Sequence, residues 1–335
     1  MRARLPLAVV LVASTAQAAP RLLVSNEDSG DVSVIDLEKN EAVASVSVGK
    51  RPRGIRLSPD GKTALVALSG SPKAGPNSDS MELPPPDRTA DGIGVLQLEP
   101  LKLLKVVKSG QDPESFDVSR DGKLVFVSNE ETAEASVVDL RSGKVTARIK
   151  VGGEPEGVTL RPDGKVLYVT SEVENKVFAI DVARRKVLKA VEVGARPRSV
   201  VFTADGKTAF VTCENGAQVA VLDGQAHSAR GRIAIESPGA KPMGAVLSPD
   251  GKMLYVSNGR GGTVAVIDVA SEKVNGTIFK VGVRPWGIAV SPDGRRLYTA
   301  NGPSHDISVI DLATKTVVRQ IKAGRSPWGL VLTNP

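Results

Sequence analysis

The sequence predicts an all-β protein, a seven-bladed β-propeller built from four-stranded antiparallel blades. Three observations indicate this fold. A unit of about 40 residues recurs along the chain, two aspartates keep a constant spacing within it, and the two ends of the chain carry complementary parts of one further unit. Because each unit packs only against its neighbours, 335 residues can form one closed ring without a second domain.

The clearest copy of the unit runs from Arg284 to Leu312. A short apolar run precedes Ser291-Pro292-Asp293-Gly294, in which proline presets the first corner of a tight turn and glycine takes a positive φ. Two further apolar runs follow, over 297–300 and 307–310, and the second ends in an aspartate. A fourth run over 317–321 closes the unit. Four short strands joined by tight turns are typical of one propeller blade.

Six copies of the unit are complete. The aspartate of the Asp-Gly turn stands at Asp60, Asp121, Asp163, Asp205, Asp250 and Asp293. In five copies a second aspartate follows 18 residues later and ends the third strand. We interpret these second aspartates as structural, because a carboxylate there can accept N–H bonds from the following turn. In the first copy the equivalent residue is Gln97, 37 residues after Asp60, so that blade carries an insertion.

The seventh unit is divided between the two ends of the chain. Residues 22–26 and 32–36 have the pattern of a second and a third strand, with no first strand before them. Residues 327–332 have the pattern of a first strand. We therefore expect the N-terminal and C-terminal strands to join in one blade, which leaves no open sheet edge in the ring.

The first 18 residues have the pattern of a cleavable secretory signal peptide. Arg2 and Arg4 precede an apolar run over 5–13, and Ala16-Gln17-Ala18 is a small-x-small cleavage site near Ala18. The apolar run is too short to span a bilayer. We expect residues 19–335 to be a single propeller domain, monomeric, without a membrane span, and either periplasmic or secreted.

The charge and the cysteine content of the chain argue against several classes of function. The net charge of +7 is spread over all blades without a Lys/Arg run, which points weakly to acidic partners and does not favour nucleic acid. The single cysteine, Cys213, excludes an internal disulfide and a Cys-based metal or haem-attachment motif. Because it ends a second strand, we expect it to be a small buried residue.

One irregular segment interrupts the pattern. Residues 69–91 contain five prolines and few apolar residues, so they form neither a strand nor a helix interior. They lie between the second and third strands of the second blade. Two interpretations stay open: a tolerated surface insertion, or a lid or docking loop, since long ordered loops on compact domains are usually functional.

The topology predicts which loops share a face. In an up-and-down blade, the loop before the first strand and the loop between the second and third strands lie on one side, here called the mouth face. The Ser-Pro-Asp-Gly turns lie on the opposite side, here called the turn face.

The loops before the first strands have the pattern x-Pro-x-Gly or x-Pro-x-Ser, so the side chains around each proline should surround the mouth of the central channel. In ring order these are Arg51 and Arg53, Asp112 and Glu114, Glu154 and Glu156, Arg196 and Arg198, Lys241 and Met243, Arg284 and Trp286, and Ser326 and Trp328. The loops after the second strands add Glu27, Glu130, Glu172 and Glu214.

Two interpretations of the mouth face also stay open. In the first, acidic and basic neighbours pair around the ring and the two tryptophans plug the channel. In the second, the mouth is a polar pocket with an aromatic wall, which stacks on a planar ligand or anchors a partner and holds a carboxylate or phosphate with arginine. The binding residues would then be Arg53, Glu114, Glu156, Arg198, Arg284, Trp286 and Trp328.

Catalytic signals in the sequence are weak. The two histidines are predicted on opposite faces, His305 on the mouth face and His227 on the turn face, so they cannot share a site. A metal would need His305 together with carboxylates such as Asp306. The sequence contains no Ser-His-Asp spacing, nucleophile elbow or phosphate-binding glycine loop. We expect no catalytic residue, no metal and no cofactor.

The sequence motifs of the second strands resemble those of a known family. Leu-Tyr-Val-Thr-Ser from Leu167, Leu-Tyr-Val-Ser-Asn from Leu254 and Leu-Tyr-Thr-Ala-Asn from Leu297 resemble the Tyr-Val-Thr-Asn (YVTN) β-propeller repeat. The runs at 51–54, 112–115, 154–157 and 196–199, with the terminal Pro-Trp-Gly, are most similar to exported β-propellers associated with pyrroloquinoline-quinone (PQQ)-dependent alcohol catabolism. This resemblance implies a cellular context and no defined activity. The insertion at 69–91 departs from that group.

These observations lead to one main hypothesis and two alternatives. The main hypothesis is an exported, non-enzymatic propeller that binds a periplasmic partner protein or a small ligand on its mouth face. The first alternative is an enzyme at the channel mouth, either lactonase-like or a haem-dependent oxidoreductase, for which His305 is the available ligand. The second is binding of single-stranded DNA, which needs aromatic side chains beside a basic groove. Trp286 and Trp328 beside Arg284 are the nearest match.

Overall fold

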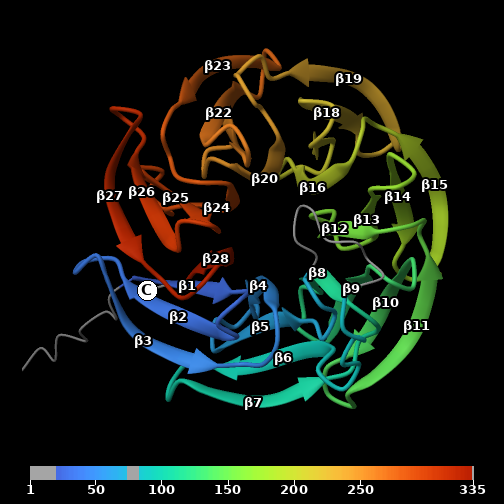
Figure 1. Ribbon diagram of the computed structural model, residues 1–335. Coiled ribbons are helices and arrows are strands. Elements are labelled where there is room, and N and C mark those ends of the chain that lie inside the picture. Colours follow the sequence, from blue (N-terminus) through green and yellow to red (C-terminus); the bar gives the residue numbers. More distant parts are fainter. Residues whose placement is uncertain (1–19, 74–82, 334–335) are drawn as a thin grey trace, which may run out of the picture.

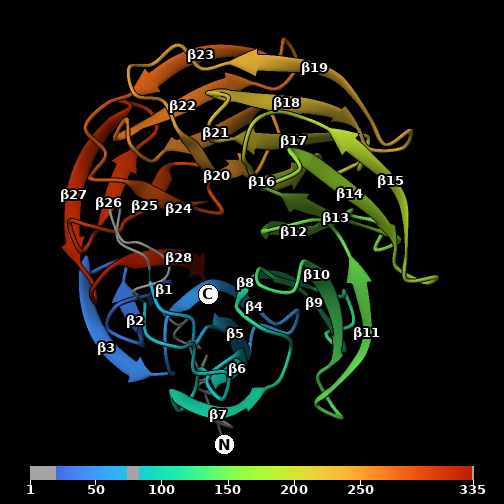
Figure 2. The same cartoon turned by 45° about the vertical axis from the view of Figure 1, so that its right-hand side comes forward.

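The chain forms a closed ring of seven four-stranded antiparallel sheets around a central channel (Figures 1 and 2). The computed structural model describes residues 20–73 and 83–333. The predicted fold class, an all-β seven-bladed propeller, is confirmed. The predicted signal peptide, residues 1–18, lies outside the described residues. Within the described residues, no helix is long and apolar enough to cross a bilayer.

The blades are numbered from the N-terminus, and their strands run from the channel outwards (Figure 1). Blade 1 contains β28 (Pro327–Leu332), β1 (Arg21–Asn26), β2 (Asp31–Asp36) and β3 (Glu41–Ser47). Blade 2 contains β4 (Pro52–Leu57), β5 (Thr63–Leu68), β6 (Gly92–Gln97) and β7 (Lys102–Val107). Blade 3 contains β8 (Pro113–Val118), β9 (Leu124–Asn129), β10 (Glu134–Asp139) and β11 (Lys144–Lys150).

The remaining four blades follow the same order. Blade 4 contains β12 (Pro155–Leu160), β13 (Val166–Ser171), β14 (Lys176–Asp181) and β15 (Lys186–Glu192). Blade 5 contains β16 (Pro197–Phe202), β17 (Thr208–Cys213), β18 (Gln218–Asp223) and β19 (Ser228–Ala234). Blade 6 contains β20 (Pro242–Leu247), β21 (Met253–Asn258), β22 (Thr263–Asp268) and β23 (Lys273–Ile278). Blade 7 contains β24 (Pro285–Val290), β25 (Arg296–Asn301), β26 (Asp306–Asp311) and β27 (Thr316–Lys322).

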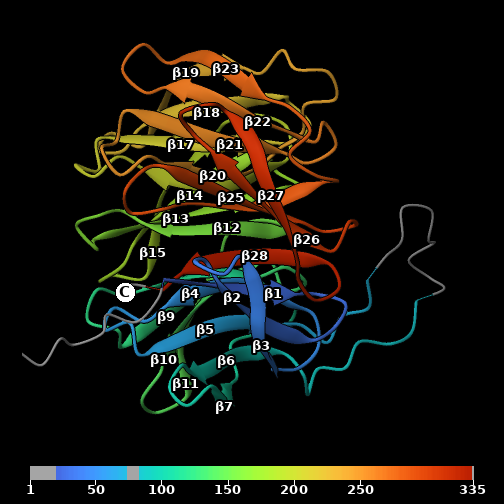
Figure 3. The ribbon, with the colours of Figure 1, turned by 90° about the vertical axis from the view of Figure 1, so that its left-hand side faces the viewer.

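Blade 1 closes the ring with strands from both ends of the chain. β28 pairs antiparallel with β1, so that Leu23 lies opposite Val331 (Figures 1 and 3). The pairing continues past the strand, where the Thr333 N–H donates to the Arg21 carbonyl oxygen at 2.8 Å. The predicted joining of the two ends in one blade is therefore confirmed, and the ring has no unpaired first or second strand at this point.

The apolar core is a ring of separate clusters between blades. In blade 4 every residue of β13 is buried, whereas the outermost strand β15 exposes all but Val191. Seven apolar clusters form, and each draws its residues from two neighbouring blades. Between blades 4 and 5, for example, the rings of Tyr168 and Phe202 lie with their centroids 4.7 Å apart. Each blade therefore depends on its two neighbours to bury its faces.

The turn face is made of repeated carboxylate-capped turns. In blade 7, the Asp293 carboxylate accepts the Arg295 N–H at 3.0 Å. At the end of the third strand, the Asp311 carboxylate accepts the N–H groups of Ala313 and Thr314 at 2.9 Å each. These backbone donors, with help from an arginine, lower the pKa of Asp311 to about 2. The structural interpretation of the repeated aspartates is confirmed.

The first strands approach one another closely around the channel, and the glycine of Pro-x-Gly makes this possible. A Cβ built on Gly157 would lie 2.1 Å from the Arg198 carbonyl oxygen of the next blade. The corresponding distances are 2.5 Å from Gly244 to the Trp286 carbonyl and 2.5 Å from Gly287 to the Trp328 carbonyl. Each contact is with backbone, which cannot rotate away. Glycine at these positions therefore sets the radius of the inner ring.

We predict that Gly157→Ala destabilises the protein, because the added methyl group forces two first strands apart. Overpacking of this kind typically costs about 1–3 kcal/mol, and thermal denaturation would measure it. Gly231→Ala is the matched control. Gly231 lies in the exposed outer strand β19, where an added Cβ meets only a carboxylate oxygen 3.9 Å away, so this variant should be as stable as the wild type or more stable. Equal stability of Gly157→Ala and the wild type would contradict the prediction.

Candidate binding site at the channel mouth

The loops of the mouth face are held by residues in a left-handed conformation. The residue before the first-strand proline has a positive φ in six blades: 41° at Arg51, 55° at Asp112, 46° at Glu154, 58° at Arg196, 51° at Arg284 and 55° at Ser326. In blades 1, 3, 4 and 5 its carbonyl accepts the N–H of the residue after the second strand, as in Asp112 with Glu130 at 3.0 Å. Non-glycine residues take this conformation only where surrounding contacts enforce it. The hydrogen bond thus places the charged residues of two loops side by side.

A second set of hydrogen bonds links neighbouring blades at the mouth. A serine or threonine hydroxyl, one residue before the end of the second strand, donates to the carbonyl of the x residue in the next blade's Pro-x-Gly or Pro-x-Ser. The pairs are Ser25 with Arg53 (2.5 Å), Ser128 with Glu156 (2.7 Å), Thr170 with Arg198 (3.1 Å), Thr212 with Met243 (2.6 Å) and Ser257 with Trp286 (2.6 Å). The second-strand motif of the repeat predicts a strand but does not predict that its Ser/Thr hydroxyl bonds the next blade. The recurring Ser/Thr itself is visible in the sequence. These hydroxyls fix the backbone from which the mouth side chains project.

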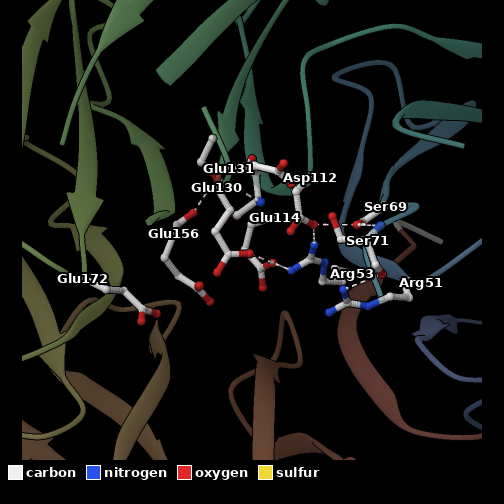
Figure 4. Close-up of polar contacts among 12 residues, drawn as sticks. Arg51, Arg53, Ser69, Ser71, Asp112, Glu114, Glu130, Glu131, Glu156 and Glu172 are labelled. Atoms are coloured by element: carbon white, nitrogen blue, oxygen red, sulfur yellow. Dashed lines mark hydrogen bonds and ion pairs between the residues drawn. The ribbon is translucent and has the colours of Figure 1, made fainter. Parts of the chain in front are cut away.

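The first ionic cluster surrounds Arg53, which is 3% exposed. Its guanidinium contacts the carboxylates of Asp112 and Glu114 and lies 3.3 Å from that of Glu130 (Figure 4). Burial raises the pKa of Glu130 to about 7, and the Glu156 and Asp112 carboxylates reinforce this against the attraction of Arg53. Although burial also opposes ionisation of Asp112, the Arg53 guanidinium keeps the pKa of that carboxyl below its usual value. Three carboxyl groups therefore share one arginine.

The second ionic cluster surrounds Arg198 in blade 5. Its guanidinium lies 2.9 Å from the Glu156 carboxylate and 2.8 Å from that of Glu214, and it also contacts Glu172. Arg196 approaches Glu172 at 2.5 Å. Burial raises the pKa of Glu172 to about 8, and the Glu156 carboxylate adds to the effect against the two arginines. For Arg198 the three carboxylates outweigh burial, so its pKa is raised above the usual value.

The described ends of the insertion belong to the same face. Arg51 pairs with Glu27 at 2.8 Å and donates to the Ser71 carbonyl oxygen at 2.9 Å. Lys73 lies 2.8 Å from the same Glu27 carboxylate and 3.0 Å from that of Asp28 in blade 1. Burial opposes ionisation of Glu27, but Arg51 and Lys73 together keep the pKa of Glu27 below its usual value. The segment before residues 74–82, which are outside the described residues, is thus anchored at the mouth.

Further contacts bind the second half of the insertion to the ring. Arg88 lies 3.2 Å from the Asp91 carboxylate and contacts that of Glu131 in blade 3. The Asp91 side chain is buried and accepts the Gly70 N–H at 2.7 Å. Lys50 and Asp87 form an ion pair of 2.8 Å. These contacts fix the described second half of the insertion to blades 2 and 3.

The other side of the mouth is aromatic and basic. Trp286, Trp328 and Met243 line a cavity of about 270 Å³ at the channel, together with Glu156 and Arg198. The Arg284 guanidinium lies 5.2 Å from the centroid of the Trp286 ring. Within the described chain Arg284 has no carboxylate within ion-pair distance, in contrast to the arginines of blades 2 and 5.

The structure therefore divides the seven predicted binding residues into two groups. Arg53, Glu114, Glu156 and Arg198 are the cores of buried ionic clusters, and only the last two line the cavity. Trp286 and Trp328 line the cavity, and Arg284 projects beside them. Ion pairing describes the first group. In the second group the two tryptophans are half-buried and Arg284 is exposed.

His305 has a structural partner at the mouth. Its Nδ1 atom accepts the Ser326 N–H at 3.0 Å, which ties blade 7 to the start of β28. Among the described residues, no group of three His, Cys, Asp or Glu side chains is placed to hold a metal ion. His227 pairs with the Tyr168 hydroxyl at 2.9 Å in another part of the ring. Cys213 is fully buried, and burial raises the pKa of its thiol to about 12.

The sequence matches one family model over three overlapping segments. Residues 79–162, 105–209 and 163–334 match the YNCE-like β-propeller family. The chain belongs to this family. Its membership confirms that the chain is a β-propeller repeat protein, as the YVTN resemblance implied. No curated protein sequence matches this YNCE-like propeller significantly.

Solved structures share the fold at low sequence identity. A protein of unknown function from Desulfotomaculum acetoxidans DSM 771 has a TM-score of 0.78 and 16% identity, covering 94% of this chain and 99% of its own. A Bacteroides fragilis protein provisionally described as a 6-phosphogluconolactonase has a TM-score of 0.76 and 22% identity, covering 96% and 99%. Kuenenia stuttgartiensis hydrazine synthase has a TM-score of 0.70 and 22% identity, covering 83% and 88%. At these identities the likeness shows the fold alone.

We predict that Glu172 makes the stability of this YNCE-like propeller depend on pH. Its folded-state pKa of about 8 lies above the value of 4.5 for a free glutamate, so its proton stabilises the folded state fully below pH 4.5 and this contribution is lost as pH rises through 8. Glu172→Gln imitates the protonated side chain. Its melting temperature relative to the wild type should therefore rise by about 4–6 °C between pH 5 and pH 9.

Thermal denaturation at both pH values checks this prediction. Glu236→Gln is the control, since Glu236 is exposed and has no ion pair among the described residues. A constant difference in melting temperature between Glu172→Gln and the wild type would contradict the prediction. It would show that Arg196 and Arg198 keep Glu172 ionised at neutral pH.

Proposed function

We propose that this chain is an exported, non-enzymatic propeller that binds a small ligand or a partner protein at its channel mouth. One observation carries the proposal. The two tryptophans stand at a cavity with an arginine that lacks a carboxylate partner among the described residues, while the acidic side chains opposite them are paired with other arginines. Aromatic and arginine side chains dominate binding energy at recognition sites. Paired and buried carboxylates, in contrast, stabilise the loops that present the site.

The cellular setting is part of the same proposal. The N-terminal pattern over residues 1–18 supports export to the periplasm. The similarity of the Pro-x-Gly runs to propellers associated with PQQ-dependent alcohol catabolism supports a role beside a quinoprotein-linked oxidation system. In that setting the propeller would hold a partner or a small molecule and leave the chemistry to other proteins.

A hydrolytic activity at the channel mouth is the second candidate. The observation that favours it is the raised pKa of Glu130 and Glu172, to about 7 and about 8, because a carboxyl that stays protonated near neutral pH can act as a general acid. A similar fold is found in the Bacteroides protein provisionally described as a 6-phosphogluconolactonase. Lactone hydrolysis that falls when Glu172 is replaced by glutamine would favour this candidate over simple binding.

We predict that binding depends on the tryptophan pair. Immobilised wild-type protein and the double variant Trp286→Ala/Trp328→Ala would be exposed to periplasmic extract of the native host, and retained proteins and small molecules would be quantified by mass spectrometry. A specific partner or ligand should be depleted at least about tenfold on the double variant, since loss of an aromatic anchor costs about 2 kcal/mol or more. Arg295→Ala is the control, because Arg295 is exposed in the same blade but on the turn face.

Two further measurements are needed to interpret the result, one of folding and one of bound cofactors. Circular dichroism and thermal denaturation must show that the double variant is folded. An absorption spectrum and elemental analysis of protein purified from the host then test for catalytic cofactors. Equal retention by the wild type and the double variant would contradict binding at the mouth, and a stoichiometric metal, haem or quinone would contradict the non-enzymatic role.

A further inference from the structure

The charges of the mouth face are distributed unevenly around the ring. The arginines of blades 2 and 5 each lie within ion-pair distance of at least one carboxylate on the same face. Blades 6 and 7 contribute four cations to the same face that have no carboxylate within ion-pair distance among the described residues: Lys241, Arg260, Lys280 and Arg284. A fifth cation, Lys322, lies 4.0 Å from the Asp306 carboxylate. Lys241 instead donates to the Asn215 side-chain oxygen at 2.8 Å. This side of the mouth therefore attracts anions.

Arg284 is the cation best placed to receive an anion. It precedes Pro285 at the start of the first strand of blade 7, so its backbone is fixed beside the channel. Its guanidinium lies over Trp286, which restricts the side chain without using its hydrogen-bond donors. Burial and the nearby positive charges of Arg260, Arg198 and Arg196 lower the pKa of Arg284 despite Glu214. A bound anion would relieve the same repulsion.

The shape of the cavity limits what accompanies the anionic group. Trp286, Trp328 and Met243 supply part of its wall. The rest of the lining comes from the first strands and includes the apolar residues Ile55, Phe116 and Leu330 and the charged residues Arg56, Glu156 and Arg198. The volume of about 270 Å³ lies just below the range of about 300–1,000 Å³ that is usual for drug-sized ligands. The space therefore suits one or two fused rings. Flat rings match indole faces better than a flexible chain does, because stacking loses little conformational freedom.

We propose that the channel mouth binds a small planar organic anion, an aromatic or conjugated carboxylate, with its carboxylate on Arg284 and its flat face against Trp286 and Trp328. The inference rests on the proposed binding function and names the ligand class for that site. Arginine pairs with a carboxylate through two parallel hydrogen bonds, which fixes the orientation of the ring system. The paired carboxylates on the other side of the mouth disfavour a second anionic group there.

Three probes with one ring system and different charges test this ligand class. They are 2-naphthoate, the neutral 2-naphthylmethanol and the cationic 2-naphthylmethylammonium. The protein has two tryptophans, so its indole N–H signals in a ¹⁵N–¹H spectrum report directly on Trp286 and Trp328. 2-Naphthoate should shift both signals saturably and bind at least about tenfold more tightly than either other probe, as expected for a charge-assisted hydrogen bond.

The variants separate the charge from the aromatic wall. Arg284→Gln should weaken 2-naphthoate binding about tenfold and leave the weak binding of the neutral probe unchanged. Arg295→Gln, on the turn face of the same blade, should change neither. Equal or tighter binding of the ammonium probe, an unchanged affinity of Arg284→Gln for 2-naphthoate, or no indole shift at all would each overturn the proposal.

One further outcome would indicate a different ligand, and another would test the proposed binding function separately from the ligand class. An oligothymidylate that shifts the indole signals with a steep salt dependence, where 2-naphthoate does not, would overturn the small-anion proposal in favour of single-stranded nucleic acid. Failure of all three naphthyl probes would also overturn it. Retention of a partner that depends on Trp286 and Trp328 would then still support binding at the mouth, so the two proposals fail separately.

Discussion

The close approach of neighbouring first strands around the channel is the constraint on which the rest of the structure depends. Glycine in Pro-x-Gly allows one backbone to pass within contact distance of the next, as Gly157 does beside Arg198. The Ser/Thr hydroxyl of the preceding blade then fixes the carbonyl of the x residue. Since backbone fills the space between neighbouring first strands, the side chains on either side of each proline are left at the mouth. The geometry of the site follows from the closure of the ring.

Charge decides which part of that mouth is available. Buried carboxylates are costly unless they are paired. Blades 1, 3, 4 and 5 bring buried glutamates within ion-pair reach of arginines: Glu27, Glu114, Glu156, Glu172 and Glu214. These pairs hold the loops in a fixed arrangement and have little remaining capacity for a ligand. Trp286 and the unpaired cations lie in blades 6 and 7, whose described mouth loops contribute no buried glutamate, and Trp328 lies in the adjoining blade 1. Ion pairing thus describes one side of the ring, and the proposed binding site lies on the other.

The insertion after β5 shows how a variable segment is attached to a regular scaffold. Its described ends contact blades 1, 2 and 3 through Lys73, Ser71 and Arg88. Lys73 also lies 5.8 Å from the centroid of the Trp286 ring in blade 7. One loop therefore connects the acidic and aromatic sides of the mouth. Proteins of different description share this fold.

The sequence by itself determined the fold to the level of individual strands. Local physics was sufficient because each blade repeats one pattern of apolar runs, Asp-Gly turns and strand-ending aspartates, and because the complementary ends at 22–36 and 327–332 could form only one blade. The sequence also placed the candidate residues on one face, since strand order alone decides which loops share a side. It did not show which of these residues form ion pairs with one another.

Only the tertiary structure decided that Arg53 and Arg198 are enclosed by carboxylates from neighbouring blades while Arg284 lies against Trp286. Those contacts join residues far apart in the chain, such as Arg53 and Asp112. They depend on the radius of the closed ring and on left-handed loop conformations that no local pattern specifies. The physical reason is that pairing energy depends on distance and burial, and both are properties of the assembled ring.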